Sequence, residues 1–148
     1  MATSSPPLGC TNFKLRQLTR RVSQHYDHHL ALAGLKTTQY SLLSHIAKLG
    51  PLTPGELARR MTLDASTLTR NLQPLVAAGW VVVGEGVNAR SRLLTLTEAG
   101  REVRQTAQRH WKNAQLELNG LLGPAMVAEL HGLLDQALAA FEPETSDE

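Results

Sequence analysis

The chain has 148 residues, of which 42% are hydrophobic and 19% charged, which predicts one soluble domain with a packed core and excludes wholesale disorder. No apolar run approaches the roughly 20 residues of a membrane span, and the first residues lack the basic and apolar parts of a secretory signal. No membrane partner and a cytoplasmic location are therefore expected. The one cysteine, Cys10, cannot form an internal disulfide.

The net charge of +2 indicates little about partners, but the distribution of charge is uneven. No Lys or Arg follows Lys112, whereas seven acidic residues do: Glu117, Glu129, Asp135, Glu142, Glu144, Asp147 and Glu148. This asymmetry is typical of a DNA-contacting body with a non-contacting end, although a solvated acidic tail over residues 143–148 explains the last residues equally well. At the other end, residues 1–10 are rich in Ser and Pro and are expected to be disordered.

Two helices are predicted in the first third of the chain. Between about Thr11 and Leu32, apolar residues recur at three- and four-residue steps, and Ala33-Gly34 ends this amphipathic helix. A second helix is predicted from Thr37, taken as its N-cap, to Leu49, where Gly50-Pro51 stops it.

The next two predicted helices form a helix-turn-helix. Thr53 and Glu56 match a T-x-x-E capping box, with a proline at the first helical position between them. Asp64 caps a further helix only a three-residue turn later, and two short helices this close must cross steeply. Gly79 ends the second of the pair. Pro74 lies inside it, removes one helical hydrogen bond and should bend it.

A β-hairpin and two long helices complete the chain. Trp80–Val83 and Arg92–Leu96 are β-branched or apolar runs joined by a Gly-rich segment, residues 84–91, which predicts a hairpin. Thr97 is the expected cap of a helix running to about Leu118, and a last helix follows Gly123-Pro124. The terminal helices are too apolar to stand alone, which predicts a homodimer interface.

The expected fold is therefore α+β and mainly helical. Residues 37–97 form a winged helix-turn-helix, which we call the reading head, and residues 11–36 with 98–142 form a helical dimerisation region, which we call the frame. A helix that enters the major groove needs hydrogen-bond donors near its exposed N-terminal end, and arginines on a hairpin loop reach a minor groove or flanking phosphates. The predicted DNA-binding residues are Ser66, Thr67, Thr69, Arg70, Gln73, Arg90 and Arg92.

Other readings of these elements remain. The hairpin arginines can merely solvate a loop, and a winged helix can bind protein in place of DNA. An enzyme is not expected, because the chain has no Gly-rich phosphate loop, no strand-borne nucleophile motif and no convincing carboxylate pair.

The run LARRMTLDASTLTRNLQPLVAAGWV, followed by RLLTLTEAGREV, resembles the MarR family of winged-helix regulators, and LKTTQYSLLSHI matches the helix before that family's reading head. The resemblance covers nearly all of the chain. It implies a homodimer joined through its terminal helices, which represses genes at a palindromic operator and is released by a small ligand or an oxidant. In one departure, Asn88-Ala89-Arg90 stands where the family's wing usually carries Asp-x-Arg, so the acidic partner of the arginine is replaced by an amide.

The sequence offers two candidate sites at which a signal would release the DNA. An aromatic or anionic effector between frame and reading head is favoured by the resemblance, and the residues of suitable type are Arg16, Arg20, Tyr26, His45 and Trp111. The alternative is a thiol sensor at Cys10, which precedes a helix N-terminus and has Lys14 nearby. Against it, the sensor position of the peroxide-responsive subgroup falls on Asn12, and Cys10 can be a bystander.

The histidine cluster His25, His28 and His29 has helical spacing that suits a metal site. Its only evident carboxylate is Asp27, which faces elsewhere on the helix. We therefore expect these histidines to cover the interface or line a pocket, and predict neither a metal nor a cofactor.

Overall fold

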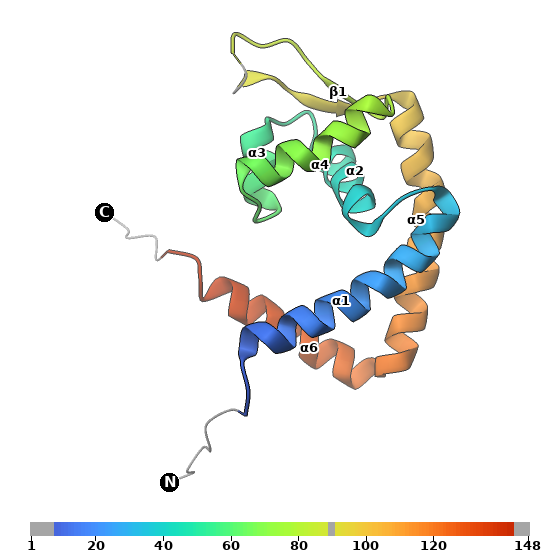
Figure 1. Ribbon diagram of the computed structural model, residues 1–148, viewed down its shortest axis with the longest axis vertical. Helices are drawn as coiled ribbons and strands as arrows, with labels where there is room; N and C mark the ends of the chain where they lie inside the picture. The colour runs from blue at the N-terminus through green and yellow to red at the C-terminus, as the bar shows by residue number, and fades with distance from the viewer. Residues whose placement is uncertain (1–7, 89–90, 144–148) are drawn as a thin grey trace.

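The computed structural model describes residues 8–88 and 91–143. Within them the chain forms six α-helices, one 3-10 turn and a two-stranded sheet, which confirms the expected mainly helical α+β fold. Figure 1 shows the small helices and the hairpin gathered at one end and the long helices crossing at the other. The expected tails over residues 1–10 and 143–148 lie mostly outside the described residues. No described helix is long and apolar enough to cross a membrane.

The first helix, α1 (Thr11–Leu30), continues into a 3-10 turn, η1 (Ala31–Ala33), and ends at Gly34, whose φ of 75° suits glycine. Helix α2 spans Thr37–Leu49. The prediction that Thr37 is its N-cap was wrong, because Thr37 is already helical. The Oδ1 atom of Asp27 on α1 accepts hydrogen bonds from the Thr37 backbone N (2.7 Å) and hydroxyl (2.6 Å), so it joins the two helices.

The predicted helix-turn-helix is present as α3 (Pro54–Arg60) and α4 (Ala65–Ala77). The capping box is reciprocal: the Glu56 backbone N donates to the Thr53 hydroxyl at 3.2 Å, and the Thr53 backbone N donates to the Glu56 carboxylate at 3.1 Å. Asp64 Oδ1 accepts from the Thr67 backbone N at 2.7 Å, as expected of an N-cap. Local signals of this kind are sufficient to place both helices.

The predicted hairpin is the wing, with strands β1 (Val81–Val83) and β2 (Leu94–Leu96). The strands are antiparallel, with Val81 opposite Leu96, and are shorter than predicted. Trp80 lies just outside β1. Its carbonyl still accepts from the Thr97 backbone N in the register of the sheet, at 3.0 Å, but its own backbone N donates to the Leu75 carbonyl of α4, also at 3.0 Å. Leu94 also pairs with Leu52, which ties the wing to the segment before α3.

Helix α5 (Glu98–Leu122) extends beyond the predicted end at Leu118, and α6 (Pro124–Ala139) follows. Gly123 ends α5 with a φ of 86°. In Figure 1, α5 runs from the wing to the far end of the molecule, where α1 and α6 lie. It contacts both, and it also contacts α2 and β2, so it links reading head to frame.

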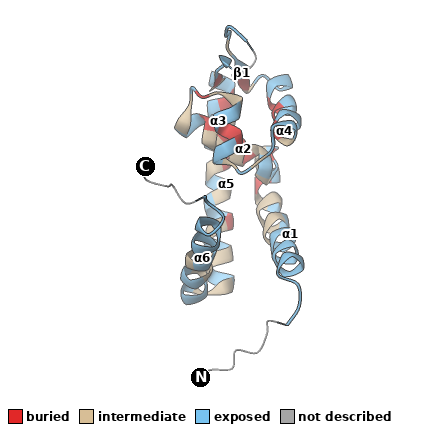
Figure 2. Ribbon diagram, turned by 90° about the vertical axis from the view of Figure 1, so that its left-hand side faces the viewer, coloured by how far each residue is buried: buried red, intermediate tan, exposed pale blue. Residues whose placement is uncertain are grey.

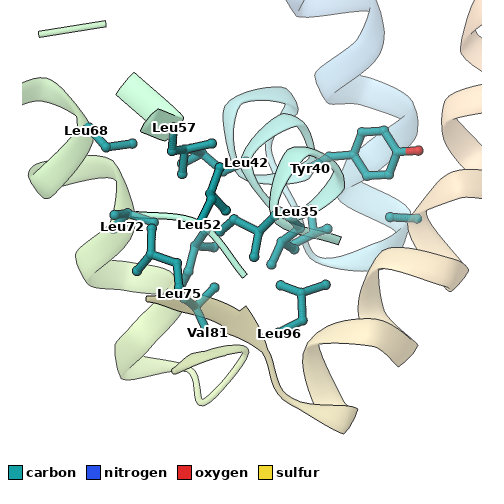
Figure 3. Packing of buried hydrophobic residues seen from close by; sticks show 14 of the residues in the cluster. Leu35, Tyr40, Leu42, Leu52, Leu57, Leu68, Leu72, Leu75, Val81 and Leu96 are labelled. Carbon is teal, nitrogen blue, oxygen red and sulfur yellow. The ribbon is translucent and has the colours of Figure 1, made fainter. Parts of the chain in front are cut away.

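The core lies in the reading head and at its junction with the frame. Figure 3 shows leucines of α2, α3 and α4 meeting residues of the wing. The largest fully buried side chains are Leu30, Leu42, Leu43, Ile46, Leu57, Leu68, Leu75 and Leu94. By contrast, α6 buries no residue, and Figure 2 shows the far half of the molecule mostly exposed or half-buried. The core therefore fixes the reading head and leaves the frame with uncovered apolar surface.

Candidate nucleic-acid interface and effector cavity

Helix α4 has two chemically different faces. Leu68, Leu72 and Leu75 are buried against the core, whereas the predicted contact residues are exposed or, for Thr67, half-buried. The exposed set is Ser66, Thr69, Arg70 and Gln73. Pro74 is also exposed and lies within the helix. The helix thus presents a polar surface to solvent along the side opposite its leucines.

The cap of α4 organises the polar groups of its first turn. Hydrogen bonds from the Thr67 backbone N, and then from the Thr67 and Ser66 side chains, hold the pKa of the Asp64 carboxyl below its usual value. The Ser66 hydroxyl donates to Asp64 at 2.9 Å, and the Thr69 hydroxyl donates to the Ala65 carbonyl at 2.9 Å. Both hydroxyls therefore keep oxygen lone pairs for an outside donor, while their protons are used within the helix.

Arg70 is the exposed cation of this surface. Its Nη2 lies 3.4 Å from the Thr67 hydroxyl, a long contact that orients the side chain only weakly. Among the described residues Arg70 forms no ion pair. A guanidinium held this loosely keeps its planar set of donors for bidentate recognition of a base edge or a phosphate.

The wing contributes one described arginine. Arg92 is exposed beside β2, whereas Arg90 lies outside the described residues. Asn88, which replaces the acid usual in the family, accepts from the Ser91 backbone N at 3.1 Å, and its own backbone N donates to the Ser91 hydroxyl at 3.1 Å. The amide therefore closes the wing turn without needing a charge.

Two cations near this surface were not among the predicted contacts. Arg59 and Arg60 lie in the last turn of α3 and are exposed. In helix-turn-helix proteins the first helix crosses the DNA backbone, which makes these arginines candidate phosphate contacts. The signal was present as the Arg-Arg pair that follows Leu57 and Ala58 in the sequence.

A separate cavity of about 460 Å³ opens where α1, α2 and α5 meet. It brings together three predicted effector residues, Tyr26, His45 and Trp111. The whole lining consists of Val22, Ser23, Tyr26, Thr37, Tyr40, Ser41, Ser44, His45, Arg104, Gln108 and Trp111. The other two predicted residues, Arg16 and Arg20, are exposed earlier on α1 and do not line it. The cation of the cavity is Arg104.

The cavity walls are fixed by their own contacts. Tyr40 and Trp111 stack with ring centroids 6.1 Å apart and planes 28° from parallel. His45 Nδ1 donates to the Ser41 carbonyl at 2.7 Å, which leaves Nε2 as the acceptor of the neutral ring.

Arg104 Nε reaches the Ser44 hydroxyl at 3.4 Å. The Tyr26 hydroxyl donates to Gln115, and burial raises the pKa of Tyr26. Stacking surface, acceptor and cation are thus present together.

The predicted thiol and histidine sites lie on α1. Cys10 is the exposed N-cap residue of that helix, and its role as a thiol sensor stays a prediction. His25 and His29 do have a carboxylate partner that sequence reasoning missed, because Glu117 on α5 lies within 2.7 Å of His29 Nε2. Asp27 faces α2, as expected.

Comparison with known proteins matches residues 33–91 to the family model described as MarR family. The multiple antibiotic resistance protein MarR of Salmonella typhimurium is 31% identical over 134 residues, which are 89% of this chain and 91% of that protein. The uncharacterised HTH-type transcriptional regulator YwoH of Bacillus subtilis is 29% identical over 85 residues, and this chain spans 62% of its length.

Among solved structures, the transcriptional regulator MosR of M. tuberculosis in complex with DNA is similar. Its TM-score is 0.75 and its identity 33%, with 90% of this chain and 100% of that chain covered. The similarity therefore includes the frame as well as the reading head.

Proposed function

Because the chain belongs to the MarR family of transcriptional regulators and is no enzyme, we propose that it is a homodimeric repressor that binds a palindromic operator through α4 and the wing. The observation that carries this proposal is the exposed polar face of α4, capped by Asp64 and opposite a buried row of leucines. A similar regulator, MosR, has been crystallised with DNA. Such a protein would act in the cytoplasm, where its DNA lies.

Within each reading head the residues would divide their roles. Arg70 would read a base edge in the major groove, with Thr67, Thr69, Ser66 and Gln73 beside it. The wing arginines Arg90 and Arg92 and the α3 pair Arg59 and Arg60 would hold the phosphate backbone. In a symmetric dimer, the two α4 helices would enter grooves about one helical turn (~34 Å) apart.

The test is a gel-shift titration with the promoter next to the gene and with scrambled duplexes. Arg70→Ala should cost about 1–3 kcal/mol of base discrimination in each half-site, or roughly 5- to 150-fold each, because a bidentate arginine contact is lost. Arg109→Ala, an exposed arginine of α5, is the matched control and should bind as the wild type does. Arg70→Ala with unchanged operator preference would refute the role of α4. A chain that shifts no duplex would favour the protein-interaction module.

The frame supports the homodimer. Its helices expose large apolar side chains that a monomer would leave in water: Phe13, Leu15, Leu18, Leu116, Leu121, Met126, Leu133, Leu134 and Leu138. Patches of this kind mark interaction surfaces, and covering them in a symmetric pair would place two reading heads side by side. Sedimentation equilibrium should give twice the 16.2 kDa chain mass.

The cavity between α1, α2 and α5 supports an aromatic, anionic effector. The Tyr40–Trp111 pair offers a stacking surface, and Arg104 offers the cation for a carboxylate. A ligand bound between frame and reading head would bias their relative placement and so change operator affinity. In a thermal-shift screen, aromatic acids should stabilise the wild type, and Arg104→Gln should lose that response while Arg20→Gln keeps it. Equal responses in both variants would contradict this assignment.

A further inference from the structure

Two histidines of α1 and one glutamate of α5 form a cluster outside both the polar face of α4 and the effector cavity. His25 and His29 are one helical turn apart, and Glu117 reaches them from the packed helix α5. One donor atom of each side chain lies within 4.8 Å of the other two. We propose that His25, His29 and Glu117 form a binding site for a divalent transition-metal ion, with Zn²⁺ as the probe.

The donor set suits such an ion. Neutral imidazole and carboxylate bind Zn²⁺ at about 2.0–2.2 Å, and three protein ligands with an open fourth position are a common arrangement. Two histidines with one carboxylate also suit Co²⁺, Ni²⁺ and Fe²⁺, whereas Mg²⁺ and Ca²⁺ prefer oxygen ligands alone. The class of ion is therefore a borderline or soft divalent cation.

One ring nitrogen of His25 is already held by a hydrogen bond. Its Nε2 lies 2.8 Å from the Ala114 carbonyl, which can only accept, so in the neutral ring Nε2 would carry the hydrogen and Nδ1 would be the nitrogen left to bind the ion. Metal-binding histidines usually donate their other N–H to a carbonyl or carboxylate, which fixes both tautomer and ring direction. Ala114 and Glu117 are three residues apart on α5, so one helix face supplies both the orienting carbonyl and the carboxylate.

The movement required of the His29–Glu117 pair is small. Tetrahedral bonds of about 2.05 Å put ligand atoms about 3.3 Å apart. His29 Nε2 and Glu117 Oε2 are 2.7 Å apart, so they must separate by about 0.6 Å, since 3.3 minus 2.7 is 0.6. The His29 side chain is 14% exposed and therefore positioned, whereas the Glu117 side chain is 62% exposed and can adjust.

By sequence spacing His28 belongs with His25 and His29, but in the structure it lies outside their cluster. It is therefore the matched control. His28 lies one residue from His29 and three from His25, but it is exposed and lies outside the cluster. A site made merely of neighbouring histidines would lose affinity when His28 is replaced. The site described here would not.

The experiment uses the full chain after dialysis against EDTA, without DNA. Zn²⁺ affinity is measured by competition with a chromophoric chelator, and Co²⁺ substitution reports four-coordinate geometry through its visible absorption. His29→Gln and Glu117→Gln should each weaken Zn²⁺ binding on the order of 100-fold or more, since even outer partners of metal ligands cost 10- to 100-fold. His28→Gln should bind Zn²⁺ as the wild type does.

Glu117→Gln also separates coordination from packing. The amide can keep the hydrogen bond to His29 but is a poor metal ligand, so thermal unfolding in EDTA should be unchanged while the Co²⁺ spectrum is lost. The proposal is overturned if the wild type binds no Zn²⁺, in which case His29 and Glu117 are an ion pair only. It is also overturned if His28→Gln loses Zn²⁺ as Glu117→Gln does.

Discussion

Gly100→Ala tests how tightly the wing is attached to α5. Gly100 lies in the first turn of α5, and a Cβ there would lie 2.1 Å from the Trp80 carbonyl oxygen and 2.9 Å from its carbon. To reach even 3.0 Å, the two segments must separate by about 0.9 Å, since 3.0 minus 2.1 is 0.9. The obstructing atoms belong to the Trp80 backbone, so no side-chain rotation can relieve the contact.

That separation would also disturb the bonds that close the junction. The Thr97 backbone N donates to the Trp80 carbonyl at 3.0 Å, and the Thr97 hydroxyl donates to the Gly79 carbonyl at 2.6 Å. Overpacking costs about 1–3 kcal/mol, and each weakened hydrogen bond adds up to about 1 kcal/mol. Alanine is favoured over glycine in a helix by only about 1 kcal/mol. The clash and the weakened bonds together outweigh the helix preference, and the free energy of unfolding should fall by up to about 4 kcal/mol.

Urea unfolding followed by far-UV circular dichroism measures this difference, at one fixed protein concentration because the stability of the proposed dimer would depend on it. Gly55→Ala is the matched control, since Gly55 lies in the first turn of α3 and its Cβ would meet nothing closer than 3.9 Å. That variant should be unchanged or gain up to about 1 kcal/mol. A Gly100→Ala chain as stable as Gly55→Ala would refute the close approach of Trp80 to α5.

Three further predictions concern the reading head and the first helix. Asp64→Ala should lower Tm at neutral pH. The pKa of Asp64 is depressed in the folded protein, so its contribution to stability is full above the ordinary carboxyl pKa of 3.8 and is lost as the pH falls below that value. The Tm values of wild type and variant should therefore converge in acid. A constant Tm difference down to pH 2 would contradict this. Arg92→Ala should weaken binding to operator and scrambled DNA alike. In the proposed dimer it removes two phosphate contacts, so the salt slope should fall by about 1.8, as measured by fluorescence anisotropy. Selective loss of operator binding would instead assign Arg92 to base reading. If Cys10 senses oxidant, Cys10→Ser should bind DNA normally yet resist release by peroxide in a gel shift, and a variant still released would exclude the thiol.

Signals that act within a few residues were sufficient to predict most of the fold. Caps at Thr53, Asp64 and Thr97 fix where helices begin, because each satisfies backbone N–H groups of its own first turn. Thr37 was misplaced because its hydroxyl bonds to Asp27 on another helix, which no local pattern reveals.

The candidate sites likewise divide into features that a local pattern predicts and features that depend on contacts between distant segments. The polar face of α4 follows from helical periodicity alone. The lining of the cavity between α1, α2 and α5 depends on which turn of α1 meets the other two helices, so a choice by residue type selected Arg16 and Arg20 and passed over Arg104. Glu117 was missed for the same reason, since it meets His29 across 88 positions of sequence.

Helix α5 has 25 residues without interruption, and at 1.5 Å per residue it is a rod of about 37 Å. One end is joined to the wing through Thr97, and the other reaches α6. A rod converts angle into displacement in proportion to its length. A tilt of about 5° at the far end would carry the wing end through about 3 Å, comparable to the base-pair rise of DNA, about 3.4 Å. Because α5 is this long, a tilt too small to disturb packing in the frame would move the reading head out of register with a DNA groove.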